Sequence, residues 1–275
     1  MRVSLVQMSP VLYDKRANLK ALNRHIDLAC ANKANLIVFP ELCLTGYMCK
    51  EAFHDLAEPI PGRSTMEIVE KAQKSGLYVL LGMPEKRDSA VYNSAAMIGP
   101  RGLIGVWRKM FLPHFVSATG IHYQEKSYFN AGEQLGVFDT GLGKIGVEIC
   151  YEIWYPEISR AHALQGAWLL LNISAAPRGV PTIFRQLGQV RAMENICWFG
   201  YVNQVGSQED VTFGGGTCMI DCYGVITHSA SLESDAGEEV ISCDITAKPI
   251  LERRKELPVL EDHQPQLIDM YSELS

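Results

Sequence analysis

Short apolar runs alternate with segments of helical periodicity along most of the chain, and this alternation constrains the fold more than any other feature of the sequence. Apolar runs at residues 3–8, 36–39 and 78–83 predict buried strands. The intervening segments at 15–33 and 66–75 predict helices, the first because its apolar residues recur at helical spacing. This order indicates an alternating α/β chain.

The alternation is interrupted in the middle of the chain. Closely spaced strands are predicted at 94–98, 103–107 and 136–138, and a turn at 99–102 joins the first two, which indicates antiparallel pairing. The alternation then resumes, with strands predicted at 145–149, 168–172 and 198–203 and helices at 157–165 and 185–196. Mixed sheets covered by helices fit this order best.

The length of the chain is compatible with a single domain. Its 275 residues, 47% of them hydrophobic, can bury a substantial core without disulfides or metals. No linker, repeat or low-complexity segment divides the sequence, so we expect one domain over residues 1–275. The charged tail from about 252 to 275 is expected to pack on the surface or on a partner subunit.

Charge and hydropathy argue against two classes of partner. The formal net charge is -6, and Lys and Arg are scattered without a basic run interleaved with aromatics, so we expect no binding to nucleic acid. No segment approaches the roughly 18 consecutive apolar residues of a membrane helix, and residues 1–7 are typical of a strand rather than a leader peptide. We therefore expect a cytoplasmic protein that acts on a small molecule.

One of the eight cysteines has a position that favours chemistry. The chain lacks a Cys-x-x-Cys pair, which indicates reduced cysteines, most of them small buried hydrophobes. Cys150, however, follows the strand predicted at 145–149, and α/β sheets bind ligands at such strand ends. After attack by this thiol, the amide of Tyr151 could face the oxyanion.

Two further strand ends offer partners for this thiol, whose ordinary pKa of about 8.5 leaves little thiolate at neutral pH. Glu41 follows the strand at 36–39 through Pro40, where its carboxylate could accept the thiol proton. Lys109 follows the strand at 103–107, where its ammonium could stabilise an oxyanion. Taken alone, Glu41 or Lys109 would be interpreted as a solvated or ion-paired surface residue. Together with Cys150 they form the set of groups expected around an activated nucleophile.

Three sequence blocks surround these residues. The blocks are Phe39-Pro40-Glu41-Leu42 with Thr45-Gly46-Tyr47, Arg108-Lys109-Met110-Phe111-Leu112, and Ile149-Cys150-Tyr151-Glu152 with Pro156-Glu157. In this order and approximate spacing they resemble the nitrilase superfamily of carbon-nitrogen hydrolases. The resemblance runs from residue 3 to about residue 244, with further support at 191–195 and 221–224.

The resemblance implies a fold and a catalytic set. The implied fold is a four-layer αββα sandwich with two mixed sheets, and the implied triad is Glu41, Lys109 and Cys150. Glu125 matches a second family glutamate that helps to orient the lysine and the substrate amide. Neither a cofactor nor a metal is expected, whereas a homodimer or higher homo-oligomer is.

The substrate expected from the resemblance is a small linear amide, cleaved through a cysteine thioester with release of ammonia or an amine. N-carbamoyl amines are the first alternative and nitriles the second. The residues after Cys150 differ from those common in nitrile-cleaving members and in members that cleave carbamoyl amino acids, which makes these two substrate classes less favoured than amides and carbamoyl amines. Tyr151, Trp154 and Tyr155 are candidates to line an apolar pocket, or else to pack the sheet edge. Two further candidate substrate contacts are Arg178, for a polar or anionic group, and His114.

The residues leave two other functions possible. A catalytically silent interaction protein on the same fold is the alternative outside enzymes, although the complete triad argues against it. A Cys-His protease needs a histidine base and leaves Glu41 and Lys109 unexplained. The histidines are dispersed and lack metal-ligand spacing.

Two glycine-rich segments are interpreted as structural. Gly141, Gly143 and Gly146 satisfy the dinucleotide pattern G-x-G-x-x-G, but they lead into a strand instead of opening a helix, which favours a hairpin turn. The run at 214–216 is not followed by Gly-Lys-Ser/Thr, so it indicates a crowded backbone before a strand rather than a phosphate cradle.

Overall fold

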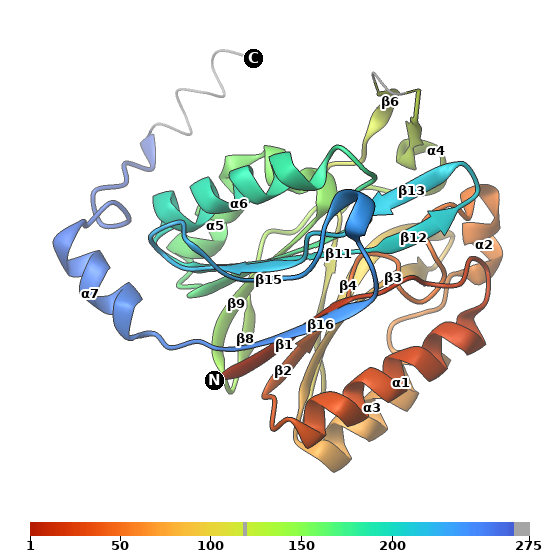
Figure 1. Cartoon of the computed structure of the whole chain (residues 1–275), viewed down its shortest axis with the longest axis horizontal. Helices are drawn as coiled ribbons and strands as arrows, with labels where there is room; N and C mark the ends of the chain where they lie inside the picture. Colours follow the sequence, from red (N-terminus) through yellow and green to blue (C-terminus); the bar gives the residue numbers. More distant parts are fainter. Residues whose placement is uncertain (118–119, 267–275) are drawn as a thin grey trace.

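A computed structural model describes residues 1–117 and 120–266, and most of its strands form two six-stranded sheets (Figure 1). In the first sheet the strand order is β16-β1-β2-β3-β4-β5. Its parallel strands are β1 (Arg2–Gln7), β2 (Leu36–Val38) and β3 (Tyr78–Arg87), and its antiparallel strands are β4 (Ala90–Gly99), β5 (Gly102–Arg108) and β16 (Glu239–Asp244).

The second sheet repeats this arrangement, with the order β15-β14-β11-β10-β9-β8. Its parallel strands are β9 (Gly143–Ile149), β10 (Leu169–Ser174) and β11 (Trp198–Asn203), and its antiparallel strands are β8 (Phe138–Thr140), β14 (Cys218–Ile220) and β15 (Ile226–Ser229). Both sheets are therefore mixed, as the resemblance implied.

Helices cover the outer face of each sheet. In Figure 1, α1 (Lys15–Ala31) and α3 (Arg63–Ser75) lie below the first sheet, and α5 (Pro156–Leu164) and α6 (Pro181–Asn195) lie above the second. The four-layer αββα sandwich is thereby confirmed.

Alternation along the strands explains why the first sheet is buried on both faces. In β1, Leu5 belongs to the core that includes the second sheet, whereas Val6 packs with Ile26 of α1. In β2, Val38 faces the first of these cores and Ile37 the second. Successive strand residues point to opposite faces, so an apolar run such as Leu36–Val38 fits a strand whose sheet lies between two layers.

The predicted turns are confirmed, with one correction to a strand. Gly99 pairs with Gly102 across the β4–β5 hairpin, and Gly143 pairs with Thr140 across the turn of the G-x-G-x-x-G motif. The strand predicted at 136–138 begins at Phe138 instead, and it pairs with β9 in the second sheet rather than with its neighbours in the first. Sequence proximity to β5 was therefore a poor guide to its partner.

Several elements were not predicted from the sequence. They are the hairpin β6 (His114–Val116) and β7 (His122–Gln124), the hairpin β12 (Val205–Gln208) and β13 (Val211–Gly214), the helices α2 (Phe53–Leu56), α4 (Glu125–Tyr128) and α7 (Lys248–Glu256), the 3-10 turns η1 (Lys50–Ala52), η2 (Cys150–Trp154) and η3 (Glu233–Asp235), and the strands β15 and β16. β16 completes the first sheet beside β1, more than 230 residues away in sequence, so local pattern could not place it.

The C-terminal segment begins with contacts to the body of the protein. Ile250 of α7 is buried, and the Arg254 guanidinium donates to the carbonyl oxygen of Ala167 at 3.1 Å. Residues 267–275, the end of the predicted tail, lie outside the described residues, and both its docking and the single domain stay predictions. No helix in the described ranges is long and apolar enough to cross a membrane.

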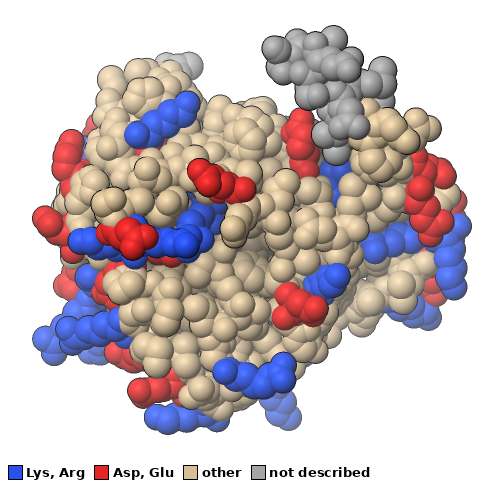
Figure 2. Space-filling model, turned by 180° about the vertical axis from the view of Figure 1, so that it is seen from behind, with Lys and Arg blue, Asp and Glu red and all other residues tan. Residues whose placement is uncertain are grey.

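Charges of both signs are interspersed on the face shown in Figure 2. Ion pairs at the surface of the protein include Lys71 with Asp27 and Arg2 with Asp244, each at 2.7 Å. Pairs of this kind contribute little to stability in water, so the sandwich depends mainly on its two apolar cores.

Candidate active site

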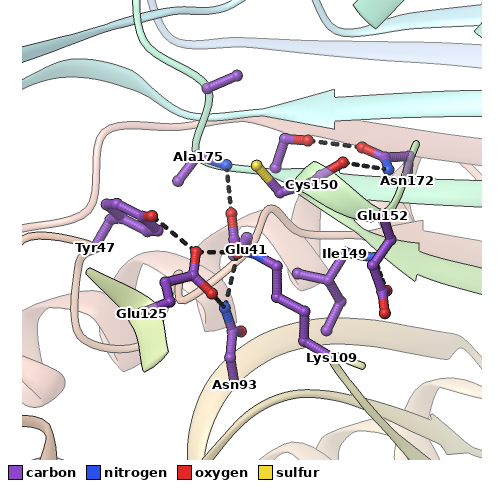
Figure 3. Close-up of polar contacts among 12 residues, drawn as sticks. Glu41, Tyr47, Asn93, Lys109, Glu125, Ile149, Cys150, Glu152, Asn172 and Ala175 are labelled. Atoms are coloured by element: carbon purple, nitrogen blue, oxygen red, sulfur yellow. Dashed lines mark hydrogen bonds and ion pairs between the residues drawn. The ribbon is translucent and has the colours of Figure 1, made fainter. Parts of the chain in front are cut away.

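Three of the predicted site residues are in direct contact. The ammonium Nζ of Lys109 lies 2.8 Å from Oε1 of Glu41 and 2.7 Å from Oε1 of Glu125 (Figure 3). Lys109 and Glu41 are fully buried, and Glu125 nearly so. One buried cation thus bridges two carboxylates that come from different elements of the fold.

Glu41 is held from several sides. Oε1 also accepts from the Asn93 side-chain amide at 2.7 Å, and Oε2 accepts from the backbone N–H of Ala175 at 2.8 Å. Its backbone carbonyl accepts from the Gln204 side chain at 2.7 Å. Gly82 makes room for this turn, because a Cβ there would lie 2.7 Å from the Glu41 Cα. The carboxylate is therefore fixed by β4, by the segment after β10 and by β3.

Cys150 sits at a sharp turn between β9 and η2. Its φ is +52°, in the left-handed region that non-glycine residues seldom adopt and that is often found at functional sites. Its carbonyl oxygen accepts from the Asn172 side chain at 3.2 Å, and the Ser174 hydroxyl in turn donates to Asn172 Oδ1 at 2.6 Å. Figure 3 shows the sulfur pointing toward the Ala175 amide and the Glu41 carboxylate.

Electrostatics explain why this thiol needs a base. Burial and the negative charge of Glu41 raise the pKa of Cys150 above its ordinary value, so the resting group is a neutral thiol. Burial alone would lower the pKa of Lys109, but the carboxylates of Glu125 and Glu41 outweigh it and keep the ammonium charged. The arrangement can move the thiol proton to a neighbouring carboxylate while a fixed positive charge stays in place.

Two residues that orient this cluster were not predicted as site residues. The Tyr47 hydroxyl donates to Glu125 Oε1 at 2.8 Å, and the Asn93 amide reaches Glu125 Oε2 at 3.5 Å as well as Glu41. Tyr47 lies within one of the blocks that carry the resemblance, so a signal was present. Asn93 sits inside β4 with no motif around it, and only the tertiary structure identifies it.

Glu152 ties the nucleophile to the lysine. Its Oε2 accepts from the backbone N–H of Ile149 at 2.7 Å and from Trp107 Nε1 at 2.9 Å, and its Oε1 accepts from the N–H of Met110 at 2.7 Å. Ile149 directly precedes Cys150, and Met110 directly follows Lys109. This one carboxylate therefore connects the two chain segments that carry Cys150 and Lys109.

A cavity of about 190 Å³ opens at Cys150. Tyr151 and Trp154, both predicted to line a pocket, do line it. Further lining residues that the sequence did not indicate include Phe115, Tyr123 and Phe184. A mostly apolar hollow with a nucleophile at its wall is typical of a site for a small organic molecule.

Three predicted substrate contacts do not line this cavity. Tyr155 stacks on Phe111 with ring centroids 3.6 Å apart, which corresponds to the alternative that it packs the sheet edge. His114 and Arg178 are exposed, and their neighbours Phe115 and Pro177 line the cavity instead. His114 faces away because adjacent residues of a strand point to opposite sides. Substrate contact by these three residues stays a prediction.

A second cavity, of about 270 Å³, lies on the other side of Tyr47. It is more polar, and its lining includes Lys50, His122, Glu125 and Asp210. Among the residues that the structure describes, no three His, Cys, Asp or Glu side chains are grouped to hold a metal ion.

A buried carboxyl group behind the nucleophile predicts a pH-dependent stability. Glu148 of β9 is almost completely buried, its Oε1 accepts from the Ser159 hydroxyl at 3.1 Å, and its Oε2 has no hydrogen-bond partner. Burial, together with the nearby Glu152, raises the pKa of Glu148 to about 8. Between its ordinary pKa of about 4.3 and this value, the folded state binds more protons than the unfolded state.

Stability should therefore fall as pH rises through this window. We expect Glu148→Gln, which mimics the protonated carboxyl, to leave Tm close to wild type at pH 5 and to raise it at pH 8 by several degrees. Melting curves of both proteins at pH 5, 6.5 and 8 measure this difference. Glu157→Gln removes an exposed carboxylate and serves as the matched control, and its Tm difference from wild type should not change with pH. If the Tm difference between Glu148→Gln and wild type is also the same at all three pH values, the prediction is contradicted.

The chain is similar in sequence and in structure to known proteins. Residues 2–254 match the family model described as carbon-nitrogen hydrolase. The chain is 33% identical over 271 residues to a nitrilase of Pyrococcus abyssi, with 95% of each chain covered. It is 30% identical to the omega-amidase NIT2 of Xenopus tropicalis, with 98% of this chain and 96% of the relative covered. The crystal structure of a carbon-nitrogen hydrolase from Helicobacter pylori G27 is 26% identical, with a TM-score of 0.87, and covers 100% of this chain and 98% of its own.

Proposed function

The chain belongs to the carbon-nitrogen hydrolase family of the nitrilase superfamily, and from this premise we propose that it hydrolyses small linear amides through a thioester on Cys150. The observation that carries the proposal is the buried contact of Lys109 with both Glu41 and Glu125 beside the thiol. A structural ion pair would not need two carboxylates next to a cysteine held at positive φ.

In the first half of the reaction, Glu41 takes the proton of Cys150 as the sulfur attacks the amide carbonyl carbon. The C–S bond forms, and the carbonyl electrons move to the oxygen. Lys109 and the backbone N–H of Tyr151 stabilise this oxyanion. Its electrons then return, the C–N bond breaks, and the nitrogen leaves with the proton from Glu41 as ammonia or an amine.

In the second half, water replaces the departed amine. Glu41 removes a proton from the water as its oxygen attacks the thioester carbon. The C–S bond breaks, the carboxylic acid leaves, and the proton on Glu41 returns to the sulfur. Glu125 keeps the Lys109 ammonium in position throughout, and no oxidant or cofactor is consumed.

N-carbamoyl amines are the second candidate substrates. The same steps would release ammonia and a carbamic acid from them, and the carbamic acid would then break down to an amine and carbon dioxide. The two classes share the reacting carbonyl and its attached NH₂ group, and these are the parts of the substrate on which Cys150, Lys109 and Glu41 would act in these steps. We also propose a cytoplasmic homodimer or higher homo-oligomer, which rests on composition and family resemblance; light scattering of the purified protein tests the assembly.

Ammonia release across a substrate panel tests the proposed function. The panel contains aliphatic amides, N-carbamoyl amines, N-carbamoyl amino acids and nitriles, with Cys150→Ala as the blank. We expect the largest kcat/KM for an aliphatic amide, because its alkyl group fits the mostly apolar cavity at Cys150 better than a polar carbamoyl nitrogen does. Activity confined to nitriles would contradict this choice of substrate, and no turnover in any class would favour a silent interaction protein.

A further inference from the structure

We propose that the cavity at Cys150 selects amides with an uncharged, apolar acyl group and rejects amides whose acyl group ends in a carboxylate. This inference rests on the proposed amide hydrolysis and specifies its substrate class. It depends on what lines the cavity and on how the charges at its floor are already paired.

Among the described residues, those that line the cavity include no charged side chain. The lining residues include Phe115, Tyr123, Tyr151, Trp154, Ile183 and Phe184, and none of the other lining residues is Lys, Arg, His, Asp or Glu. An alkyl or aryl group that enters this space exchanges water for apolar contacts, which stabilises the complex by about 0.8 kcal/mol for each buried CH₂. A carboxylate in the same place would lose its hydration without gaining a charged partner.

The floor of the site cannot supply that partner. Lys109 is the cation labelled in Figure 3, and its single positive charge is shared between Glu41 and Glu125 at 2.8 and 2.7 Å. With the thiol neutral, the cluster carries one net negative charge when both carboxylates are ionised. Burial raises the pKa of Glu125, and with that carboxyl protonated the cluster is neutral, so a substrate carboxylate meets no net attraction in either state.

Cations around the cavity do not alter this balance. Arg178 is exposed and does not line the cavity, and Lys50 lines the other cavity, where it is paired with Glu209 at 2.5 Å. Ala118 and Thr119, which the structure does not describe, are uncharged residues by sequence.

A matched pair of substrates tests the inference. Hexanamide and adipamate have the same number of carbons, and only the terminal methyl group of the first is a carboxylate in the second. We expect kcat/KM for hexanamide to exceed that for adipamate by on the order of 100-fold, because the carboxylate would be buried unpaired. Equal values, or a preference for adipamate, would overturn the inference while leaving amide hydrolysis intact.

Protection of the thiol provides a readout that does not depend on turnover. Alkylation of Cys150 by iodoacetamide should slow several-fold in the presence of hexanamide and remain unchanged with the same concentration of adipamate. If neither amide is hydrolysed, the proposed function fails, and this protection experiment still decides the selectivity. Protection by adipamate equal to that by hexanamide would overturn it.

Ile183 offers a position at which the selectivity can be changed. It lines the cavity but is 41% exposed, so a long side chain can extend along the wall with its charged end near water. We expect Ile183→Arg to raise kcat/KM for adipamate at least about tenfold relative to Ile183→Gln, a neutral polar control. No difference between the two variants would show that charge does not determine the selectivity. A tenfold loss of adipamate hydrolysis in Arg178→Ala would identify Arg178 as an existing counter-ion and also overturn the inference.

Discussion

Replacing Cys150 with alanine is expected to lower kcat for amide hydrolysis by at least about 10⁴-fold, because no other group can form the thioester. The side chain is small and 8% exposed, so its removal should shift Tm by no more than a few degrees. Ammonia release under saturating amide and a melting curve of the same preparation measure the two effects. Together they separate a chemical role from a structural one.

Two controls sharpen this experiment. Cys30→Ala removes a half-buried cysteine of α1, away from the cavity, and should retain activity within a factor of two of wild type. Cys150→Ser keeps the approximate shape but replaces the thiol by a hydroxyl that Glu41 cannot readily deprotonate, so it should be as inactive as the alanine variant. Turnover above about a tenth of wild type in either Cys150 variant would exclude the thioester mechanism.

The order of the sandwich could be predicted because its strands carry strong local signals. The runs that became β1, β2, β9, β10 and β11 are mostly buried on both faces, so each is rich in apolar residues despite a few buried polar ones. β16 has exposed residues along its length, and its pairing with β1 joins opposite ends of the chain. The 136–138 prediction failed for a related reason, since a strand three residues long contains too little pattern to choose between two sheets.

The residues of the candidate site that follow predicted strands could be identified from the sequence. Glu41, Lys109 and Cys150 each follow a strand, and the sheet edges bring these ends together. Asn93 and the Ala175 amide, by contrast, fix Glu41 through contacts across 52 and 134 residues of sequence. The first contact depends on the order of the strands within the first sheet and the second on the packing of one sheet on the other, and no local motif reports either.

Glu152 illustrates the same limit within a recognised block. Its position two residues after Cys150 was part of the resemblance, yet its partners at Trp107 and Met110 lie more than 40 residues away. Burial raises its pKa to about 7, although three N–H donors favour its charged form. The sequence could show that this glutamate is near the nucleophile, but only the structure shows that it connects β9 to the end of β5.

Lys109→Met is expected to have the largest combined effect on activity and stability. Its ammonium is the cation that pairs with the buried carboxylates of Glu41 and Glu125, and removing it leaves two negative groups close together without a partner. Breaking a buried pair in this way lowers the free energy of unfolding by about 3–5 kcal/mol. Loss of the oxyanion donor should also lower kcat by on the order of 10³-fold.

A second substitution separates these two effects. Adding Glu125→Gln to Lys109→Met removes one of the unpaired charges, so the double variant should recover part of the lost free energy of unfolding but none of the lost kcat. Urea denaturation of the wild type, both single variants and the double variant gives the coupling energy between the two positions. If the free energies of the single variants simply add, the ion pair contributes no stability, and the lysine acts on the reaction alone. If kcat recovers with stability, the lysine positions the site without contacting the oxyanion, and the role proposed for it would be wrong.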